Sequence, residues 1–150
     1  MAALLAFVHH LAAFAVVSAL TGELVLVRSA LTVESARRIV RFDTAYGLSA
    51  IVLVTVGLLR VFHFEKGAAY YFHSAPFLAK LTLFAVVGLL SIYPTREFLS
   101  WRKALRQGQV PMVDAGRLLA IRRVIHWELA FVALILLLAA LAARGIGHLG

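Results

Sequence analysis

Cysteine is absent from this chain of 150 residues, and charged residues make up only 15% of it. Without cysteine there can be no disulfide, iron–sulfur cluster, thiolate-ligated zinc or haem, or covalent CxxCH haem attachment. Histidine, carboxylate, lysine, methionine and backbone groups remain as ligands. A soluble domain carries about a quarter charged residues. The low charge therefore points away from a water-soluble fold.

The motifs of soluble enzymes are also missing. The chain contains no P-loop, no nucleophile elbow and no HExxH pair, so nothing supports nucleotide hydrolysis, serine hydrolase chemistry or zinc proteolysis. Function must therefore be sought in isolated polar groups within an apolar chain.

Four long apolar runs fill most of the sequence, which is 63% apolar with a mean hydropathy of +0.94. A helix needs about 20 residues to cross the hydrocarbon core of a bilayer. The runs lack the alternation of barrel strands, so helices are the remaining solution. We predict an all-α integral membrane four-helix bundle, a single domain over residues 1–150. The expected spans cover about residues 2–27, 43–62, 76–94 and 124–143.

Arginine and lysine predict the orientation of these spans. Four basic residues follow the first span and seven follow the third: Arg28, Arg37, Arg38 and Arg41, then Arg96, Arg102, Lys103, Arg106, Arg117, Arg122 and Arg123. Three lie on the other side: Arg60, Lys66 and Arg144. The positive-inside rule then places two basic loops in the cytoplasm and both termini outside. The net charge of +8 is explained by anionic headgroups, so no nucleic-acid partner is expected.

Local signals punctuate the two basic loops. Thr32 and Ser35 are candidate caps for a short amphipathic helix in the first loop. The segment at 107–111, which contains glycine and proline, breaks the second loop. Pro94 is expected to end or kink the third span.

Ionisable residues inside a bilayer are costly, which makes them the first candidates for function. The predicted topology sorts them into an outer and an inner layer. The outer layer holds His9, His10, His63, His73, Lys80 and His148, and the inner layer holds Glu23, Arg28, Asp43, His126 and Glu128. At about 100° per residue, His10 shares a stripe with Phe14 and Arg28, whereas His9 shares one with Glu23. We expect His10 to face the site.

Imidazole is a frequent ligand of haem and of metal ions, and bundle cores hold such cofactors between facing helices. The first hypothesis is a b-type haem protein with a redox or electron-transfer role. His10 would ligate iron, with His73 or Lys80 as the second group. Arg28 lies about 27 Å from His10 at 1.5 Å per residue, so Arg28 and Glu128 would form a separate inner pair or proton route.

Two alternatives stay open. His9, His10, His63 and His73 could form an outward-facing site for copper or zinc. The polar groups could instead only fix helix register, in a non-catalytic structural or assembly subunit. Small residues in the second and third spans permit a homodimer, and a redox role would require an electron-transfer partner.

Four motifs carry a resemblance to known proteins: FVHHL at 7–11, GELVLVR at 22–28, FLAKL at 77–81 and GLLSI at 88–92. The sequence resembles a bacterial family of small four-helix membrane proteins without an assigned activity. This resemblance implies a multi-pass protein of the bacterial inner membrane.

The chain also resembles, more distantly, the HemJ-type protoporphyrinogen oxidases, which are small helical membrane proteins associated with haem b. The matching positions are His10 in the first helix, Arg28 at its end, Lys80 in the third and Glu128 in the last. The resemblance implies that His10 is an axial ligand and that Lys80, Arg28 and Glu128 are functional polar groups. The Asn-Glu-x-Pro pattern of that family is absent around Glu128, which leaves the substrate open.

Overall fold

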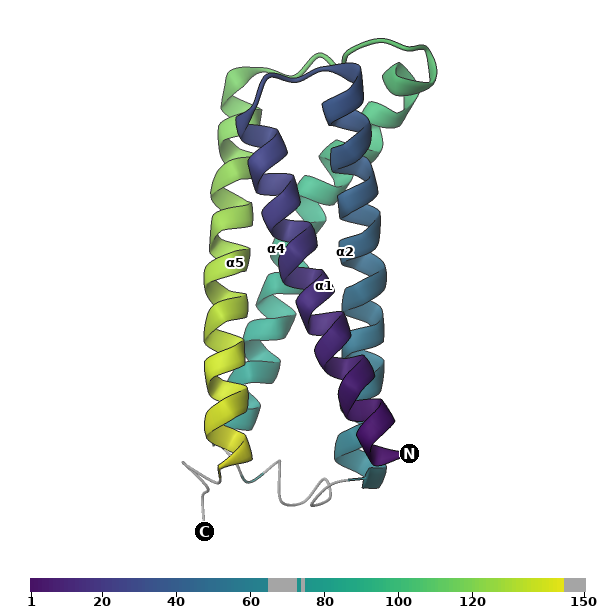
Figure 1. The fold of residues 1–150 in the computed structure, drawn as a ribbon. Coiled ribbons are helices and arrows are strands. Elements are labelled where there is room, and N and C mark those ends of the chain that lie inside the picture. The colour runs from purple at the N-terminus through teal and green to yellow at the C-terminus, as the bar shows by residue number, and fades with distance from the viewer. Residues whose placement is uncertain (65–72, 74, 145–150) are drawn as a thin grey trace.

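The computed structural model describes residues 1–64, 73 and 75–144, and within these ranges it contains helices and no strand (Figure 1). The elements are α1 (Ala2–Arg28), α2 (Val33–Leu59), the short π-helix η1 (Arg60–Phe64), α4 (Ala75–Arg106) and α5 (Ala115–Ala143). The four α-helices are each long and apolar enough to cross a membrane, α2 together with its π-helical extension. The predicted all-α membrane four-helix bundle is confirmed. Lys66 and His148 lie outside the described residues.

Two helices begin about ten residues earlier than hydropathy predicted. Thr32 and Ser35 do form a cap: the Ser35 backbone N–H donates to Thr32 Oγ1 at 3.0 Å, and the Thr32 N–H donates to Ser35 Oγ at 2.8 Å. This capping box starts α2 itself and no separate loop helix. Asp114 caps α5 in the same way, accepting from the Arg117 N–H at 2.9 Å. Most of the predicted loop arginines therefore lie on helix ends.

The third span is also longer than expected. Pro94 lies inside α4, and the helix continues to Arg106. A proline removes one backbone hydrogen bond, a loss that membrane helices tolerate where neighbouring groups compensate. Just beyond the last helical residue, Gly108 terminates the helix with a φ of 70°, a conformation that favours glycine. The Gln109 N–H reaches the Ala104 carbonyl at 3.0 Å, the long bond of a Schellman motif.

Helix packing is tightest near the α1–α2 and α4–α5 connections, which we call the connection end. The main buried cluster contains Val16, Ala19, Leu20, Leu24, Val27, Ala36, Ile39, Tyr46, Phe98, Trp101, Leu105, Ile121 and Ile125. Phe98 and Trp101 pack edge to face at its centre, with ring centroids 5.0 Å apart. At the opposite end, Val61 and Phe77 form a second, smaller buried cluster among the described residues. Many large apolar side chains along the spans, including Phe14, Ile51 and Leu89, are exposed on the outer surface of the bundle, as lipid contact requires.

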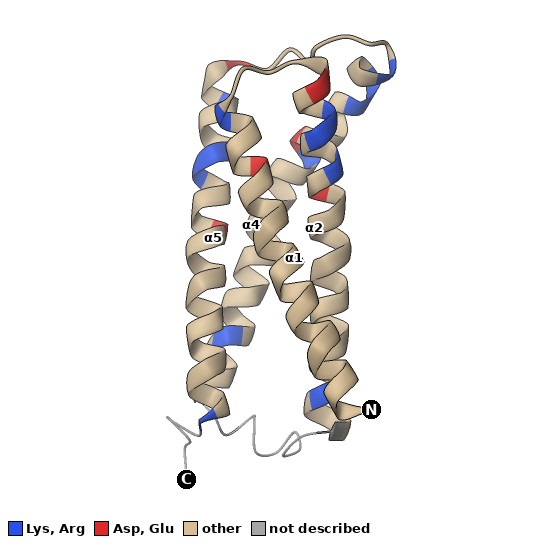
Figure 2. Ribbon diagram, in the orientation of Figure 1, with Lys and Arg blue, Asp and Glu red and all other residues tan. Residues whose placement is uncertain are grey.

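Charged residues, like the main buried cluster, are concentrated at one end of the bundle (Figure 2). Basic and acidic residues gather at the connection end, whereas α1 begins and α5 ends at the opposite, sparsely charged end, which we call the terminal end (Figure 2). The helices thus run alternately up and down, and the connections that carry most of the arginines share one end. Which side of the membrane this end faces remains a prediction from the positive-inside rule.

Candidate functional site

Three carboxyl groups are buried within the membrane-spanning helices. Glu23 of α1, Asp43 of α2 and Glu128 of α5 expose 1%, 7% and 0% of their surface. Carboxylates are almost never fully buried unless they are paired. These three are placed there by helical spacing, because each continues a stripe of buried residues, such as Leu20, Glu23 and Val27 on α1.

Hydroxyl groups connect two of the carboxyls to neighbouring helices. Thr95 Oγ1 of α4 donates to Asp43 Oδ1 at 2.6 Å. The Tyr46 hydroxyl donates to Glu128 Oε1 at 3.5 Å, a long and weak bond, and the Ser91 side chain lies close enough to interact with it.

Glu23 lies close enough to Asp43 and Glu128 to interact electrostatically with both. All four long helices therefore contribute to one layer of polar groups. We call Glu23, Asp43, Tyr46, Thr95 and Glu128 the acidic layer.

The acidic layer is incompletely satisfied. Glu23 Oε1 and Glu128 Oε2 are buried and have no hydrogen-bond partner among the described residues. Leaving an ionised carboxylate buried and unpaired costs several kcal/mol. These two groups must therefore carry a proton or be neutralised by a bound cation. Within the described ranges, no group of three or more His, Asp or Glu residues is arranged to hold a metal ion.

Arginines border the acidic layer at the connection end, and Arg102 is close enough to Asp43 to interact with it electrostatically. Sequence considerations suggested Arg28 as a partner of Glu128, and this pairing is wrong: Arg28 Nη2 lies 2.6 Å from His126 Nε2. His126 and Glu128 face different directions, as their spacing predicted, because His126 is exposed and Glu128 is buried. Arg122 donates from Nε and Nη2 to the Val27 carbonyl, at 3.1 and 2.9 Å.

The two adjacent histidines of α1 face the opposite way from the prediction, in which His10 and not His9 faced the site. His10 is exposed, and its Nδ1 lies 2.6 Å from the Ala6 carbonyl. His9 is half-buried against α2, where it lies close to the Leu53 backbone, and its Nδ1 has no hydrogen-bond partner among the described residues. Gly57 makes room for this ring, since a Cβ there would lie 3.1 Å from His9 Cε1. The stripe containing His10 faces outward, with Phe14 73% exposed.

The remaining predicted ligands also lie at the terminal end. His63 and His73 are exposed. Lys80 is half-buried, with Nζ 4.6 Å from the centroid of the Phe77 ring. His73 precedes α4, which begins at Ala75, so it lies outside the helix that carries Lys80. His9 interacts electrostatically with Arg60, His10 and Lys80, and this group of four cationic or basic side chains is called the terminal-end cluster.

Sequence reasoning placed Glu23, Asp43 and Glu128 at similar depth but missed Tyr46, Ser91 and Thr95. A usable signal existed for Tyr46, because Ile39, Asp43 and Tyr46 recur at spacings of four and three, and this stripe is buried on α2. No comparable signal marked Thr95, since its role depends on how α4 packs against α2.

Comparison with known proteins agrees with this architecture. No curated protein and no solved structure matches the chain. One family model covers residues 1–147, nearly the whole sequence. The chain therefore belongs to the family described as "Predicted membrane protein (DUF2214)".

Proposed function

We propose that this membrane protein binds and releases protons at the acidic layer, as the proton-binding step of a transport or sensing cycle. The observation that carries the proposal is the pair Glu23 and Glu128. Both are fully buried within the spans, and each has one oxygen without a hydrogen-bond partner in the part of the chain that the structure describes. Intramembrane carboxyl groups of this kind are typical of proton relays.

The arrangement favours exchange with the connection end. Glu128 lies only two positions along α5 from His126, which is exposed near the connection end, although the two side chains point in different directions. In the other direction, Glu23 and His9 are 14 positions apart on α1, or about 21 Å along the helix. Because the α1 residues buried between them are apolar, the proposal is a proton site open to one side and not a continuous wire across the membrane.

Infrared difference spectroscopy on the full chain in liposomes tests this proposal directly. We expect the C=O stretching band of a protonated carboxylic acid, shifted in D2O and diminished in Glu128→Gln and Glu23→Gln. Glu34→Gln, which alters an exposed carboxylate on α2, should leave the band unchanged. Absence of any protonated-acid band across the pH range in which the protein stays folded would sink the proposal.

We propose haem b binding at the terminal-end cluster as a second candidate. Two observations favour it: the His9 Nδ1 is buried without a partner, and the Nδ1–H of His10 can donate to the Ala6 carbonyl, leaving its Nε2 lone pair available. Arg60 and Lys80 would pair with propionates, and haem would supply one-electron chemistry. Arg28 does not fit this site, because its side chain is engaged with His126 at the other end.

The visible absorption spectrum of the purified protein tests the second candidate. A Soret band lost in His9→Ala or His10→Ala supports it. A colourless protein with stoichiometric copper or zinc bound through His9, His10, His63 and His73 would support the metal alternative instead. If the protein binds neither haem nor metal, the terminal-end cluster is left with a structural or assembly role.

We further propose that the connection end faces the cytoplasm of a bacterium, with both termini outside the inner membrane. Eleven of the 15 basic residues belong to this end. Because the chain lacks cysteine, single-cysteine labelling in intact cells can test the orientation. Thr32→Cys should be protected from an impermeant maleimide and Ala143→Cys should be labelled. The opposite pattern would reverse the assignment.

A further inference from the structure

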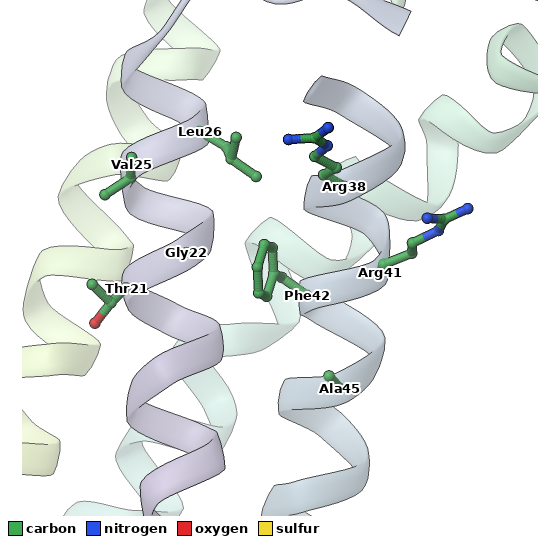
Figure 3. A pocket seen from close by; sticks show the side chains of 8 residues that line it. All are labelled: Thr21, Gly22, Val25, Leu26, Arg38, Arg41, Phe42 and Ala45. Carbon is green, nitrogen blue, oxygen red and sulfur yellow. The ribbon is translucent and has the colours of Figure 1, made fainter. Parts of the chain in front are cut away.

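A groove of about 610 Å³ opens between α1 and α2 at the connection end, outside the acidic layer. It is lined by Thr21, Gly22, Val25, Leu26, Arg38, Arg41, Phe42 and Ala45 (Figure 3). Apart from Thr21 and the two arginines, these residues are apolar or glycine. The groove therefore combines an apolar body with two cations.

The body of the groove is shaped by one close approach. The Phe42 ring points toward α1 at Gly22 (Figure 3), and a Cβ at Gly22 would lie 2.9 Å from Phe42 Cζ. Only glycine leaves room for the ring in this position. Phe42 remains 37% exposed, so its ring forms an accessible apolar wall between the helices.

The rim is cationic. Arg41 is exposed and makes no hydrogen bond or ion pair with the described residues. Arg38 is bound through Nε to Glu34 at 3.0 Å, which uses one of the five N–H donors of its guanidinium. Both side chains lie on the connection-end side of Phe42 (Figure 3). Free guanidinium donors suit the oxygens of a phosphate group.

We propose that this groove binds one anionic phospholipid, with its phosphate on Arg41 and Arg38 and one acyl chain against Phe42 and Ala45. Arg41 and Phe42 follow Arg38 by three and four positions, and Ala45 follows these two by four and three, so all four residues share one face of α2. From position 38 to position 45 this face extends over about 10 Å, at 1.5 Å per residue. Headgroup and chain contacts thus follow each other in the order in which a phospholipid presents them. Basic pockets between transmembrane helices are known to take such headgroups.

The charge pattern favours a lipid over other occupants. A second copy docked symmetrically through this groove would bring its own Arg38 and Arg41 toward the same cations, which is unfavourable. A free phosphate ion would use the rim and leave the apolar wall of Phe42 uncovered. A single phospholipid satisfies both parts of the groove.

Native mass spectrometry of the full chain, released from detergent with defined lipids, tests the proposal. Phosphatidylglycerol and phosphatidylcholine with identical acyl chains would be compared at equal concentration. We expect preferential retention of phosphatidylglycerol, reduced about fivefold by Arg41→Gln and further by the double change with Arg38→Gln. Arg123→Gln removes an exposed arginine of α5 outside the groove and should leave retention unchanged. Equal retention of the two lipids, or equal effects of Arg41→Gln and Arg123→Gln, would overturn the proposal.

A second variant tests the apolar part. Gly22→Leu forces Phe42 into the groove and should reduce lipid retention, whereas Gly88→Leu, on α4 with open space around it, should not. If Gly22→Leu fails to fold, the arginine variants still decide the question. Competition by sn-glycerol 1-phosphate as effective as by whole lipid would overturn chain binding. A lipid-independent dimer abolished by Gly22→Leu would assign the groove to a second copy and overturn the proposal.

Discussion

Arg28, the last residue of α1, donates to His126 of α5 with 2.6 Å between the two nitrogens, although 98 positions separate them. For His126 Nε2 to accept, its Nδ1 must carry the proton, and that nitrogen lies 2.6 Å from the Arg122 carbonyl. Arg122 in turn donates to the Val27 carbonyl, one of the helix-end carbonyls that lack a helical partner. These contacts fix the end of α1 against α5 just beyond Glu23 and Glu128.

We expect Arg28→Ala and His126→Ala each to lower the free energy of unfolding by about 1 kcal/mol, because each removes the same hydrogen bond. The double variant should cost less than the two single variants together, with a coupling of about 0.5–1 kcal/mol. Denaturant titration in detergent micelles measures this. Arg123→Ala, which removes an exposed arginine of the same helix, is the control. Strictly additive losses would show that the contact contributes nothing.

The membrane spans were predictable from hydropathy. The cap at Thr32 and Ser35 was also predictable, but that it begins α2 itself was not, and neither was the start of α5 at Asp114. A helix that crosses the hydrocarbon core needs about 20 apolar residues, and runs of this length are visible directly in the sequence. Beyond the hydrocarbon, water tolerates either loop or helix. There the helix start depends on caps such as Thr32 and Asp114, and hydropathy carries no information about them.

The candidate site shows the same limit. Depth along each span placed Glu23, Asp43 and Glu128 in one layer, because rise per residue is nearly constant. Which groups touch depends on helix rotation and on the packing partners. The side chains of His9 and His10 point in directions only about 100° apart around the helix axis. Assigning one of them to the interior therefore required knowing that α2 packs on the His9 side. Tertiary packing likewise decides that Arg28 bonds His126 and not Glu128.

The placement of His9 can be tested through Gly57. A Cβ at Gly57 would lie 3.1 Å from His9 Cε1, so we expect Gly57→Val to destabilise the fold by about 1–3 kcal/mol through overpacking. Combining it with His9→Ala should recover much of this loss, because the alanine leaves space for the valine. Thermal unfolding in detergent reports both effects.

His10→Ala is the matched comparison, since it alters the neighbouring histidine. It should not rescue Gly57→Val, because the His10 ring lies on the exposed face of α1. Gly47→Val adds the same side chain to α2 where nothing lies within 4 Å, and it should be tolerated. Rescue by His10→Ala in place of His9→Ala would contradict the observed rotation of α1.

The Thr95–Asp43 contact anchors α4 to α2 within the acidic layer. Thr95→Val keeps the side-chain shape but removes the 2.6 Å hydrogen bond. We expect a loss of about 1–3 kcal/mol in unfolding free energy, because a buried carboxyl oxygen loses its donor. Thr95→Ser should retain most of the stability. Thr82→Val provides the control, since the Thr82 hydroxyl only bonds the Leu78 carbonyl of its own helix. Equal losses for Thr95→Val and Thr82→Val would show that the contact with Asp43 is not important.

Substitutions at Glu128 can show whether its carboxyl group is protonated or neutralised by a bound cation. Glutamine mimics the protonated acid and can still accept from Tyr46, so Glu128→Gln should change the unfolding free energy by less than about 1 kcal/mol if Glu128 carries a proton. Glu128→Lys would bury an unpaired cation and should cost more than about 3 kcal/mol. The same two changes at the exposed Glu34 should stay within about 0.5 kcal/mol. Unfolding measured at several sodium and potassium concentrations completes the test. If stability of the native protein rises with one cation and this dependence disappears in Glu128→Gln, the acidic layer binds that cation, and the proton-binding proposal fails.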